Sequence, residues 1–467
     1  MTDTVAVPLT RAALADAAEP LPAAPARIVH IGLGAFHRAH QAWYTARATN
    51  AADWGIRAFT GRSGQLADLL SPQDGVFTLV ERAATGDRLE HIGSIVAVHP
   101  AAHTAQLSSA LASPRTALVT LTVTEAGYSL TPTGKPDLAD PALLRDLHAL
   151  TDAHPSGAPH SPETILGRLL TGLAERRRRD GGPLAVVPCD NFPSNGTILG
   201  RTVTQLAEDV SAGLGDWIRA NVSFVSTSVD RITPRVDGTL AEQVRTATGW
   251  VDAAPVAAEP FTDWTLSGEF PAGRPDWESA GAVFVEDIEP YESRKLWLLN
   301  GSHSLLAYLG RLRGHTTVAQ AIGDNECLRA VDQWWDEASR HLPSNVNPAA
   351  YRAALLERFR NPRIAHSLTQ ISADGLTKLS IRIVPVARME LREGRDAEAA
   401  AGVVAAWIAA VRTGLAVPDA RAAEVDAAAV DANPTGALLS LVAPDLAVHP
   451  DFAPRVAYLT DRLTGGS

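Results

Sequence analysis

Cysteine is scarce in this chain of 467 residues, which contains only Cys189 and Cys327. The two lie far apart in the sequence, in neither the paired spacing of a disulfide framework nor that of a zinc knuckle. This scarcity excludes a small disulfide-stabilised scaffold. It also favours a reducing compartment, and we expect a cytoplasmic protein.

Positive charge is also in short supply. The chain has 41 lysines and arginines against 52 acidic residues, a net charge of −11. Nucleic-acid binding requires concentrated positive charge, so we expect no nucleic-acid partner. The one basic cluster, in the run ERRRRD from Glu175 to Asp180, stands at the polar end of a helical pattern. It is expected to be a solvated helix end.

Long apolar runs are absent as well. The longest, AAAGVVAAWIAAV ending at Val411, is shorter than the roughly 20 residues of a membrane span and predicts a buried helix. The N-terminal stretch lacks the basic start and the continuous apolar core of a signal peptide. We therefore expect a soluble protein without a membrane partner.

What the chain does contain is enough sequence for two domains. Up to about residue 285, β-rich runs such as WGIRAFTG, TALVTLTVTEAGY, PLAVVPCDNF and VSFVSTSVDRI alternate with helical patterns. This alternation predicts a parallel sheet with helices on both faces. From about Tyr291 onward, Ala/Leu-rich helical patterns predominate. We expect an α/β fold: a Pro/Ala-rich arm (1–26), a Rossmann-type doubly wound domain (27–285) and a mainly helical domain (286–467).

A glycine turn follows the first predicted strand in the run HIGLGAFH. Such a turn before a helix lets a pyrophosphate approach the backbone at the helix N-terminus. The third glycine of the usual dinucleotide fingerprint is missing, because a histidine occupies its position. The place of the turn, at the first strand of a doubly wound sheet, still favours a dinucleotide. We expect contacts from Gly32, Gly34, Ala35, Phe36 and His37.

The end of the second predicted strand, FTGRSGQ, lacks the carboxylate that normally holds the adenosine ribose. Arg62 stands there instead. An arginine at this place either accepts a 2′-phosphate or covers the adenine, so both NAD and NADP remain open as cofactors. His37 and His40 have no thiolate or carboxylate cluster beside them, and we expect no metal.

Six segments together resemble the polyol-specific long-chain dehydrogenases, the mannitol dehydrogenase family: IVHIGLGAFHRAHQAWYT, LTVTEAGY, CDNFPSNG, FVSTSVDRITP, EPYESRKLWLLNGSHS and NPRIAHSLTQISADGLTKL. The resemblance runs in order from about Arg27 to beyond Lys378. It implies a Rossmann-type domain, a helical domain and a site in the cleft between them. There a polyol would be oxidised, or a ketose reduced, with a nicotinamide cofactor and without zinc. Family members are often monomers, and we expect a monomer or weak oligomer.

Oxidation of a secondary alcohol by hydride transfer requires a base for the alcohol proton. Lys295 precedes the apolar run LWLL, and desolvation at such a place lowers the pKa of a lysine. The resemblance assigns this residue as the base, whereas a lysine snorkelling from a half-buried helix is the structural alternative. At 100° per residue, Lys295, Asn300 and His303 share one half of an α-helix. Gly301 costs about 1 kcal/mol relative to alanine there, and close approach of substrate or a neighbouring element is the expected compensation.

The resemblance also implies roles for other polar residues. Asn300 and Asn191 would donate hydrogen bonds to the reacting oxygen, and His303 would bind a substrate hydroxyl or orient the lysine. Glu292, three residues before Lys295, is placed to relay the proton to solvent. Asp230 is expected to bind a substrate hydroxyl. Without the resemblance, Asn191 is equally consistent with an Asx-turn, and Asp230 with an ion pair to the adjacent arginine.

The substrate is the least determined feature. Lys378 matches a family lysine, and Arg382 resembles the arginine of the K-L-P-x-R pattern of uronate reductases, where a cation suits a sugar carboxylate. Ser380 replaces the proline of that pattern, and Ile381 stands near the place of the second lysine of mannitol 2-dehydrogenases. Mannitol/fructose and mannonate/fructuronate chemistry both remain open. Arabinitol dehydrogenase and mannitol-1-phosphate 5-dehydrogenase activities are alternatives, and a non-catalytic NAD(P)-binding sensor is the alternative outside enzymes.

Overall fold

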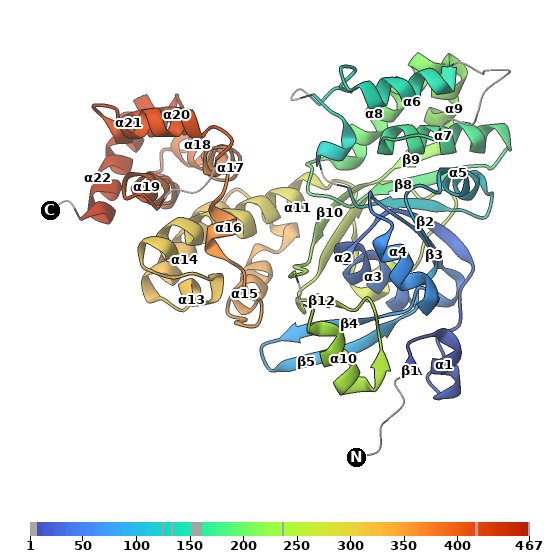
Figure 1. The fold of residues 1–467 in the computed structure, drawn as a ribbon. Coiled ribbons are helices and arrows are strands. Elements are labelled where there is room, and N and C mark those ends of the chain that lie inside the picture. Colours follow the sequence, from blue (N-terminus) through green and yellow to red (C-terminus); the bar gives the residue numbers. More distant parts are fainter. Residues whose placement is uncertain are drawn as a thin grey trace. The chain divides into compact units, whose positions relative to one another are not determined.

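The computed structural model of the chain describes residues 7–123, 125–131, 134–151, 161–235, 238–415 and 419–465. Its backbone divides into two compact units, Met1–Glu289 and Pro290–Ser467 (Figure 1). Strands occur in the first unit. In the described part of the second unit the elements are helical, apart from an isolated bridge between Thr317 and Ser367.

The first unit is built on a six-stranded parallel sheet in the order β6-β3-β2-β7-β8-β9. The order proceeds outward from β2 in both directions, so the sheet is doubly wound in the Rossmann arrangement, and the predicted fold class is confirmed. The strands are β2 (Ala26–Leu33), β3 (Gly55–Thr60), β6 (Ile95–His99), β7 (Leu118–Leu121), β8 (Leu184–Pro188) and β9 (Val222–Phe224).

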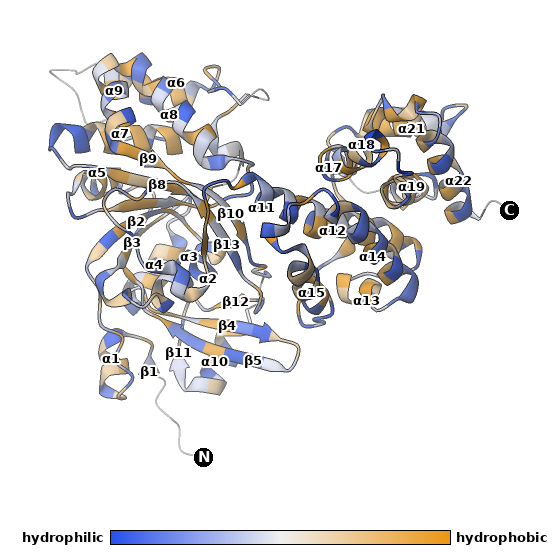
Figure 2. Ribbon diagram, turned by 180° about the vertical axis from the view of Figure 1, so that it is seen from behind, coloured by the Kyte–Doolittle hydropathy of each residue, from blue (hydrophilic) through white to orange (hydrophobic). Residues whose placement is uncertain are grey.

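Helices cover both faces of this sheet, because its apolar side chains alternate between them. Val29 and Ile31 of β2 belong to the core on one face. The helices on that face are α5 (Thr104–Ala112), α6 (Pro141–Thr151), α7 (Ile165–Arg178), α8 (Asn195–Val210) and α9 (Ala212–Asn221). Ile28 belongs to the core on the other face, with α2 (Ala35–Ala39), α3 (Gln41–Arg47) and α4 (Gln65–Leu70). Figure 2 shows the central strands in the orange of apolar residues.

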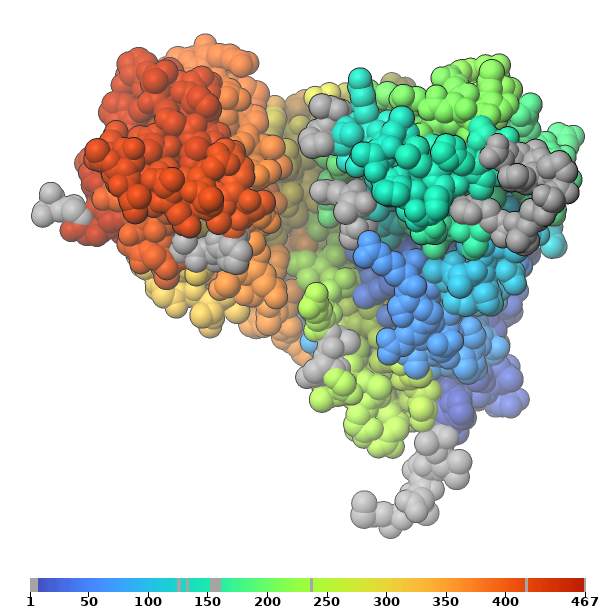
Figure 3. Space-filling model, turned by 45° about the horizontal axis from the view of Figure 1, so that its top comes forward, coloured from blue at the N-terminus to red at the C-terminus, as the bar shows by residue number. Residues whose placement is uncertain are grey.

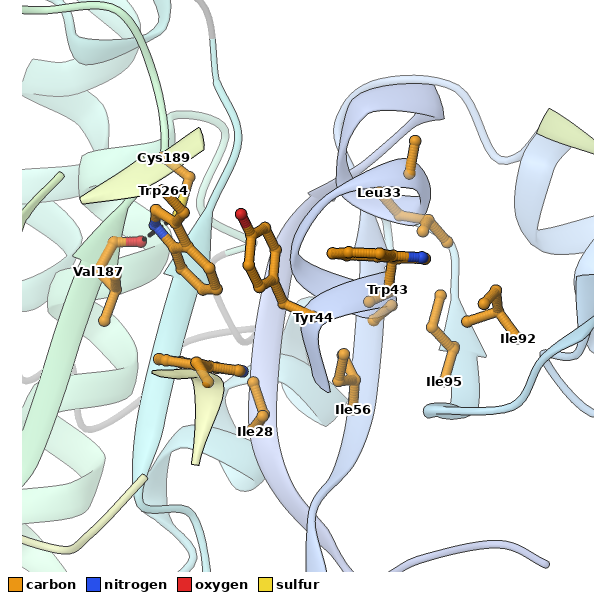
Figure 4. Close-up of a cluster of buried hydrophobic side chains, with 14 of the residues drawn as sticks. Ile28, Leu33, Trp43, Tyr44, Ile56, Ile92, Ile95, Val187, Cys189 and Trp264 are labelled. Carbon is orange, nitrogen blue, oxygen red and sulfur yellow. Dashed lines mark hydrogen bonds between the residues drawn. The ribbon is translucent and has the colours of Figure 1, made fainter. Parts of the chain in front are cut away.

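An aromatic cluster fills the second of these cores (Figure 4). Tyr44 of α3 lies between Trp43 and Trp264, with ring centroids 5.0 Å from each. Edge-to-face pairs of this kind add about 0.5–1.5 kcal/mol beyond the burial of their area. Trp264 belongs to β13 (Asp263–Ser267), so the cluster ties a second, smaller sheet to the first.

Three smaller sheets complete the unit, and the alternation of strands and helices did not predict them. They join β10 (Ser226–Asp230), β13 and β14 (Val283–Phe284); β12 (Val256–Ala258), β4 (Phe77–Ala83) and β5 (Gly86–Ile92); and β1 (Val7–Pro8) and β11 (Trp250–Val251). The run Val222 to Ile232, predicted as one strand, is therefore two. β9 pairs with β8, and β10 pairs with β13 in a different sheet.

The predicted N-terminal arm is packed against the unit in its described part. It contains β1 and helix α1 (Arg11–Asp16), and Leu9 and Leu14 are fully buried. The Arg11 guanidinium donates to the carbonyls of Leu21, Gly93 and Ile95. These contacts fix the arm to the edge of the six-stranded sheet.

The run of arginines at the end of α7 is only partly solvated, which corrects the expectation. Arg176 is buried, and its guanidinium donates five hydrogen bonds of 2.7–3.0 Å to backbone carbonyls. The acceptors are Leu111, Ser113, Thr116, Gly182 and Pro183. Only Arg177, Arg178 and Arg179 are exposed.

The second unit packs its helices around α19 (Glu398–Arg412), whose residues from Ala400 to Ala410 are almost all buried. This confirms the buried helix predicted to end near Val411. Of its neighbours, α14 (Asn325–Ser339), α18 (Val384–Arg392), α21 (Pro434–Val442) and α22 (Phe452–Thr464) contact α19. The unit also contains α13 (Val318–Ile322), α15 (Pro348–Phe359), α16 (Leu368–Ser372), α17 (Gly375–Arg382) and α20 (Ala422–Ala429). Figure 3 shows the C-terminal helices of this unit, in orange and red, as one continuous body. Among the described residues, no helix is long and apolar enough to cross a bilayer.

Candidate active site

The glycine turn after β2 uses its two glycines for different reasons. Gly32 has φ +109°, and a Cβ there would lie 2.2 Å from the carbonyl oxygen of Thr122. The backbone itself therefore requires this glycine. Gly34 has extended backbone, and the nearest atom to its missing Cβ is 3.7 Å away. Its small size leaves the backbone open to a ligand at the start of α2, as pyrophosphate binding requires.

His37, at the place of the third glycine, packs beneath the turn. Its ring stacks on that of His30 in β2, with centroids 3.3 Å apart. Burial lowers the pKa of His30 to about 3 and that of His37 well below the ordinary value, so both rings are neutral at physiological pH. The His37 side chain has no exposed surface. Its ring therefore supports the helix–strand contact, and the cofactor contact of His37 stays a prediction.

A cavity of about 680 Å³ opens at the carboxyl edge of the sheet, in the first unit. It is lined by Gly61 and Arg62 after β3, Thr122 after β7, and Thr164 and Arg168 at the start of α7. The Thr122 hydroxyl donates to the Gly32 carbonyl, which joins the cavity wall to the glycine turn. Strand order reverses at β2 and β7, where doubly wound sheets bind nucleotides. The turn and the cavity together fit a dinucleotide.

The segment after β8 forms a turn that holds Asn191 at the sheet edge. Oδ1 of the buried Asp190 accepts a hydrogen bond of 2.8 Å from the Phe192 amide, and its Oδ2 accepts one from the Tyr128 hydroxyl. Asp190 thus makes the Asx-turn. Asn191 could not make it, since Pro193, two residues on, has no N–H. The Asn191 side chain is exposed, and the Asx-turn interpretation of this residue is wrong.

Asp230 ends β10 and is 9% exposed. The adjacent Arg231 forms its salt bridge with Glu81, at 2.9 Å, and donates to the carbonyls of Ala39 and Glu259. Through these contacts Arg231 connects β10 to β4 and α2.

Lys295 begins a π-helix, which corrects the α-helical spacing assumed from the sequence. Helix α11 (Glu289–Arg294) continues into the π-helix η5 (Lys295–Gly301), then α12 (Ser302–Leu305) and a second π-helix, η6 (Leu306–Gly310). In a π-helix, residues five apart are joined by the backbone hydrogen bond and lie about one turn apart. Lys295 and Asn300 therefore come nearer to one face than the 140° of an α-helix gives. Both side chains are half-buried, as is Glu292 on α11.

Gly301 closes the π-helix against α14. A Cβ on this residue would lie 2.7 Å from Nε1 of Trp334. That indole donates to the Trp297 carbonyl at 2.8 Å, and the indole of Trp335 donates to Leu298 at 2.9 Å. The cost of a glycine at position 301 is therefore offset by close packing against the neighbouring helix α14. The two tryptophans approach closely and bind carbonyls of the widened helix.

His303 lies in the interior of the second unit among cationic side chains. Burial lowers its pKa well below the ordinary value, and the nearby charges of His366, Arg358, Arg382 and Lys378 lower it further. The ring is therefore neutral. It packs against His366 and Phe359, and its Nε2 has no hydrogen-bond partner in the described part of the chain.

Lys378 and Arg382, one turn apart on α17, are half-buried beside His303. The Lys378 ammonium donates to the Ile371 carbonyl at 3.0 Å, and burial lowers its pKa. The Arg382 guanidinium donates to the Asn300 carbonyl at 3.3 Å and to the Ser304 hydroxyl at 3.2 Å. Burial lowers the pKa of Arg382 to about 10, so it stays charged at neutral pH. Ile381, by contrast, is 49% exposed.

The structure therefore gathers the predicted site residues into two groups, one in each unit. Gly32, Gly34, Ala35, Phe36 and Arg62 lie at the nucleotide edge of the sheet, where Asn191 ends β8, and Asp230 ends β10 of the neighbouring sheet. Glu292, Lys295, Asn300, His303, Lys378 and Arg382 lie on α11 through α12 and on α17. Sequence reasoning missed Tyr128 and Asp190, although both stand in the quoted motifs. It also missed Trp334 and Arg358, which no local pattern marks. Among the described residues, no cluster of three or more His, Cys, Asp or Glu is arranged to hold a metal.

Comparison with known proteins gives matches along most of the chain. Family models described as the mannitol dehydrogenase Rossmann domain and the mannitol dehydrogenase C-terminal domain match residues 26–279 and 287–447. The chain is 36% identical to D-mannonate oxidoreductase of Escherichia coli strain K12 over 82% of its own length and 79% of that protein. It is 38% identical to D-arabinitol 4-dehydrogenase of Ralstonia nicotianae, over 82% of each.

Among solved structures, the chain resembles Pseudomonas fluorescens mannitol 2-dehydrogenase in its ternary complex with NAD and D-mannitol. The TM-score is 0.75 at 35% identity, over 99% of this chain and 94% of that one. The match extends across both units.

Proposed function

Since the chain belongs to the mannitol dehydrogenase family, a family of polyol oxidoreductases, we propose that it interconverts a mannonate-type sugar acid and its keto acid, such as fructuronate. NAD is the hydride carrier, and Lys295 is the general base. The coarser assignment, an NAD-dependent polyol dehydrogenase, rests on the family. The finer assignment rests on one observation, the cationic surroundings of His303.

That observation concerns charge within the second unit. Arg358, Lys378 and Arg382 all act on the neutral ring of His303, together with His366. Concentrated cations suit a substrate carboxylate, which arginine binds with two parallel hydrogen bonds. The neutral His303 supplies an additional polar contact for a hydroxyl.

Composition supports the role of Lys295. Of the 41 lysines and arginines only three are lysines: Lys135, Lys295 and Lys378. A guanidinium cannot be deprotonated in proteins, whereas an amine can act as a base once desolvation lowers its pKa. In a chain that otherwise uses arginine for positive charge, a lysine at the start of the π-helix fits a residue that must exchange protons.

The chemistry follows from these groups. The neutral amine of Lys295 would take the proton of the alcohol oxygen, and NAD, when bound, would accept the hydride from the carbon that bears this oxygen. The Asn300 amide donates to the oxygen as negative charge develops on it. Asn191 would be a second donor and Asp230 a ligand for a substrate hydroxyl. Glu292, one turn before Lys295, would pass the proton to solvent.

A neutral polyol such as mannitol or arabinitol is the second candidate. The observation in its favour is that Lys378 and Arg382 already donate to protein oxygens, those of Ile371, Asn300 and Ser304. Their charges are thus partly used within the fold. If these bonds persist with substrate bound, less of the charge is available for a carboxylate.

The test follows nicotinamide absorbance with purified protein. Fructuronate, tagaturonate, fructose, xylulose and fructose 6-phosphate are each offered with NADH and NADPH. We expect the highest kcat/KM for a uronate, and in Lys378→Ala a larger rise of KM for uronate than for fructose. Higher kcat/KM for a neutral ketose would favour the second candidate. No turnover with any pair, despite cofactor binding, would favour a non-catalytic sensor.

The role of the base has its own control. Lys295→Ala is expected to lose at least about 100-fold in kcat, the scale of general base catalysis, while Lys135→Ala, at an exposed loop lysine, keeps full activity. With three lysines, biosynthetic labelling of their ε-carbons gives three resolvable titrations by NMR. A Lys295 pKa as high as that of Lys135 would contradict the base role and favour a snorkelling lysine.

A further inference from the structure

The adenosine end of the cavity in the first unit carries two arginines. Arg62 follows β3 and is exposed, and among the described residues its side chain has no hydrogen bond or ion pair. Arg168 of α7 faces the same cavity. In doubly wound sheets, the end of the second strand contacts the ribose that carries the adenine. The groups at the end of β3 therefore meet the 2′ position of that ribose.

Arg168 fixes the position of Arg62. Its Nε donates to the Pro162 carbonyl at 3.1 Å, and its Nη1 donates to the Gly61 carbonyl at 3.3 Å. The second bond holds the residue directly before Arg62. Within the described part of the chain the Nη2 of Arg168 donates to no protein atom, so this nitrogen remains available to a ligand.

The acidic residues of the cavity are already paired. Both carboxylate oxygens of Glu163 accept from the Arg145 guanidinium, at 3.0 and 3.1 Å. Asp140 precedes α6 and accepts from the Ser129 hydroxyl and the Ala142 amide, and the pKa of Asp140 is lowered chiefly by that amide. Neither Arg62 nor Arg168 has a carboxylate partner among the described residues, so their positive charge remains for a ligand. A phosphate ester is the ligand that complements it.

We infer that Arg62 and Arg168 accept the 2′-phosphate of NADP, so that the enzyme uses NADPH as well as NADH. The inference rests on the proposed function only in requiring that a dinucleotide occupies this cavity. It depends neither on the sugar substrate nor on Lys295. Arg62 supplies most of the discrimination, and Arg168 positions it and adds one hydrogen bond.

The test measures binding to the full chain, without turnover. 2′,5′-ADP and 5′-AMP differ only in the 2′-phosphate, and their Kd values are determined by calorimetry at low salt. We expect 2′,5′-ADP to bind at least about tenfold more tightly than 5′-AMP, and the preference to shrink as ionic strength rises. Arg62→Ser should abolish the preference, so that the two Kd values become equal. Arg115→Ser, at an exposed arginine preceding the opposite end of β7, is the matched control and should keep the preference.

Kinetics separate this inference from the function on which it rests. The ratio of kcat/KM for NADPH to that for NADH should fall at least tenfold in Arg62→Ser and stay at the wild-type value in Arg115→Ser. Equal Kd values for the two nucleotides in the wild type, with normal NADH turnover, would overturn the inference and leave the oxidoreductase intact. A preference that survives both Arg62→Ser and Arg168→Lys would also overturn it. If neither nucleotide binds, the cofactor site itself is refuted, and the inference with it.

Discussion

The two glycines of the turn after β2 serve different requirements. The fold requires Gly32, whereas we expect ligand binding to require Gly34. The Cβ of an alanine at position 32 would collide with the Thr122 carbonyl, and its φ is unfavourable for any L side chain. The Cβ of an alanine at position 34 would meet nothing closer than 3.7 Å. The free protein therefore tolerates the second change and not the first.

We predict that Gly34→Ala keeps the midpoint of thermal unfolding within about 2 °C of the wild type but raises the KM for NADH at least tenfold, because the added methyl group occupies the approach of the pyrophosphate. Gly32→Ala should lower the unfolding midpoint clearly. Calorimetry and steady-state kinetics measure both. An unchanged KM in Gly34→Ala would mean that the cofactor does not approach this turn.

Arg176 shows how a charged residue can belong to the interior. Its five carbonyl partners come from two chain segments, 111–116 and 182–183, so the guanidinium replaces hydrogen bonds that these turns do not make with one another. Arg176→Ala should lower the free energy of unfolding by more than about 3 kcal/mol, since each buried carbonyl left unpaired costs about 1–3 kcal/mol.

The adjacent surface arginine provides the control for that prediction. Arg178→Ala removes an exposed pair with Glu175 and should change stability by less than about 1 kcal/mol. Urea unfolding of both variants gives the comparison. A similar loss in the two would show that the carbonyl acceptors of Arg176 are satisfied in another way.

At the scale of elements, the π-helix from Lys295 to Gly301 is the feature that the sequence pattern could not show. Helical periodicity over Tyr291 to Gly310 identified a helix, but the angular spacing of its polar residues was that of an α-helix. The extra residue per turn depends on Trp334 and Trp335, more than thirty residues further on, which bind the carbonyls of Trp297 and Leu298. Only tertiary contact makes the wider helix favourable.

We predict that Gly301→Ala lowers kcat at least tenfold, because the new methyl group displaces the Trp334 indole and shifts Asn300 with the helix. Gly402→Ala in α19 is the matched control. A Cβ there meets nothing within 4 Å, so the change should stabilise the unit by up to about 1 kcal/mol and leave kcat unchanged. Near-UV circular dichroism should register the tryptophan shift in the first variant alone. Full activity of Gly301→Ala would contradict a strict requirement for this geometry.

At the scale of the whole molecule, both units contain histidines that are held neutral. Burial lowers the pKa of His30 to about 3, and the pKa values of His37 and His303 are well below the ordinary value. The unfolded chain binds a proton at each of these sites near pH 6.5, whereas the folded chain does not. Stability is therefore complete above that pH and falls below it.

We expect the unfolding midpoint to be level above about pH 7.5 and to decline between pH 6.5 and 5. Each such histidine contributes a slope of up to about 1.4 kcal/mol per pH unit. Carboxylates with lowered pKa, such as Glu390, act only at more acidic pH, since their ordinary pKa is lower. Thermal melts at half-unit intervals measure the decline, which should be shallower in His303→Asn. A midpoint that stays level to pH 5 would show that these rings gain protons while folded.

Much of the fold follows from the sequence, because its strongest signals are local. The runs at Trp54–Gly61 and Pro183–Phe192 contain β3 and β8, and the glycine turn follows β2 as expected. The hairpin of β4 and β5 also had a local signal, the alternating run FTLVERAATGDRLEHI, and was overlooked. By contrast, the sheet of β10, β13 and β14 pairs segments distant in sequence, so no window contains its signal.

The candidate site likewise contains residues with a local sequence signal and contacts between residues distant in sequence. Motifs identified Lys295, Asn300, His303 and Asn191, because they stand in short, distinctive runs. The supporting contacts, such as Arg382 to Asn300 and Arg231 to Glu81, join residues about 80 and 150 positions apart. Such contacts decide which charges remain available to a substrate. The substrate therefore could not be read from the motifs alone.

The pairing of β12 with β4 has a consequence for synthesis of the chain on the ribosome. The six-stranded sheet is complete once β9 has emerged, but β4 obtains its parallel partner only with residues 256–258, and β1 obtains its partner only with residues 250–251. Until then the nascent chain exposes unpaired strand edges, which invite aggregation. A fragment cut after β9 would keep those edges open permanently. A separately expressed nucleotide-binding unit should therefore extend to Glu289.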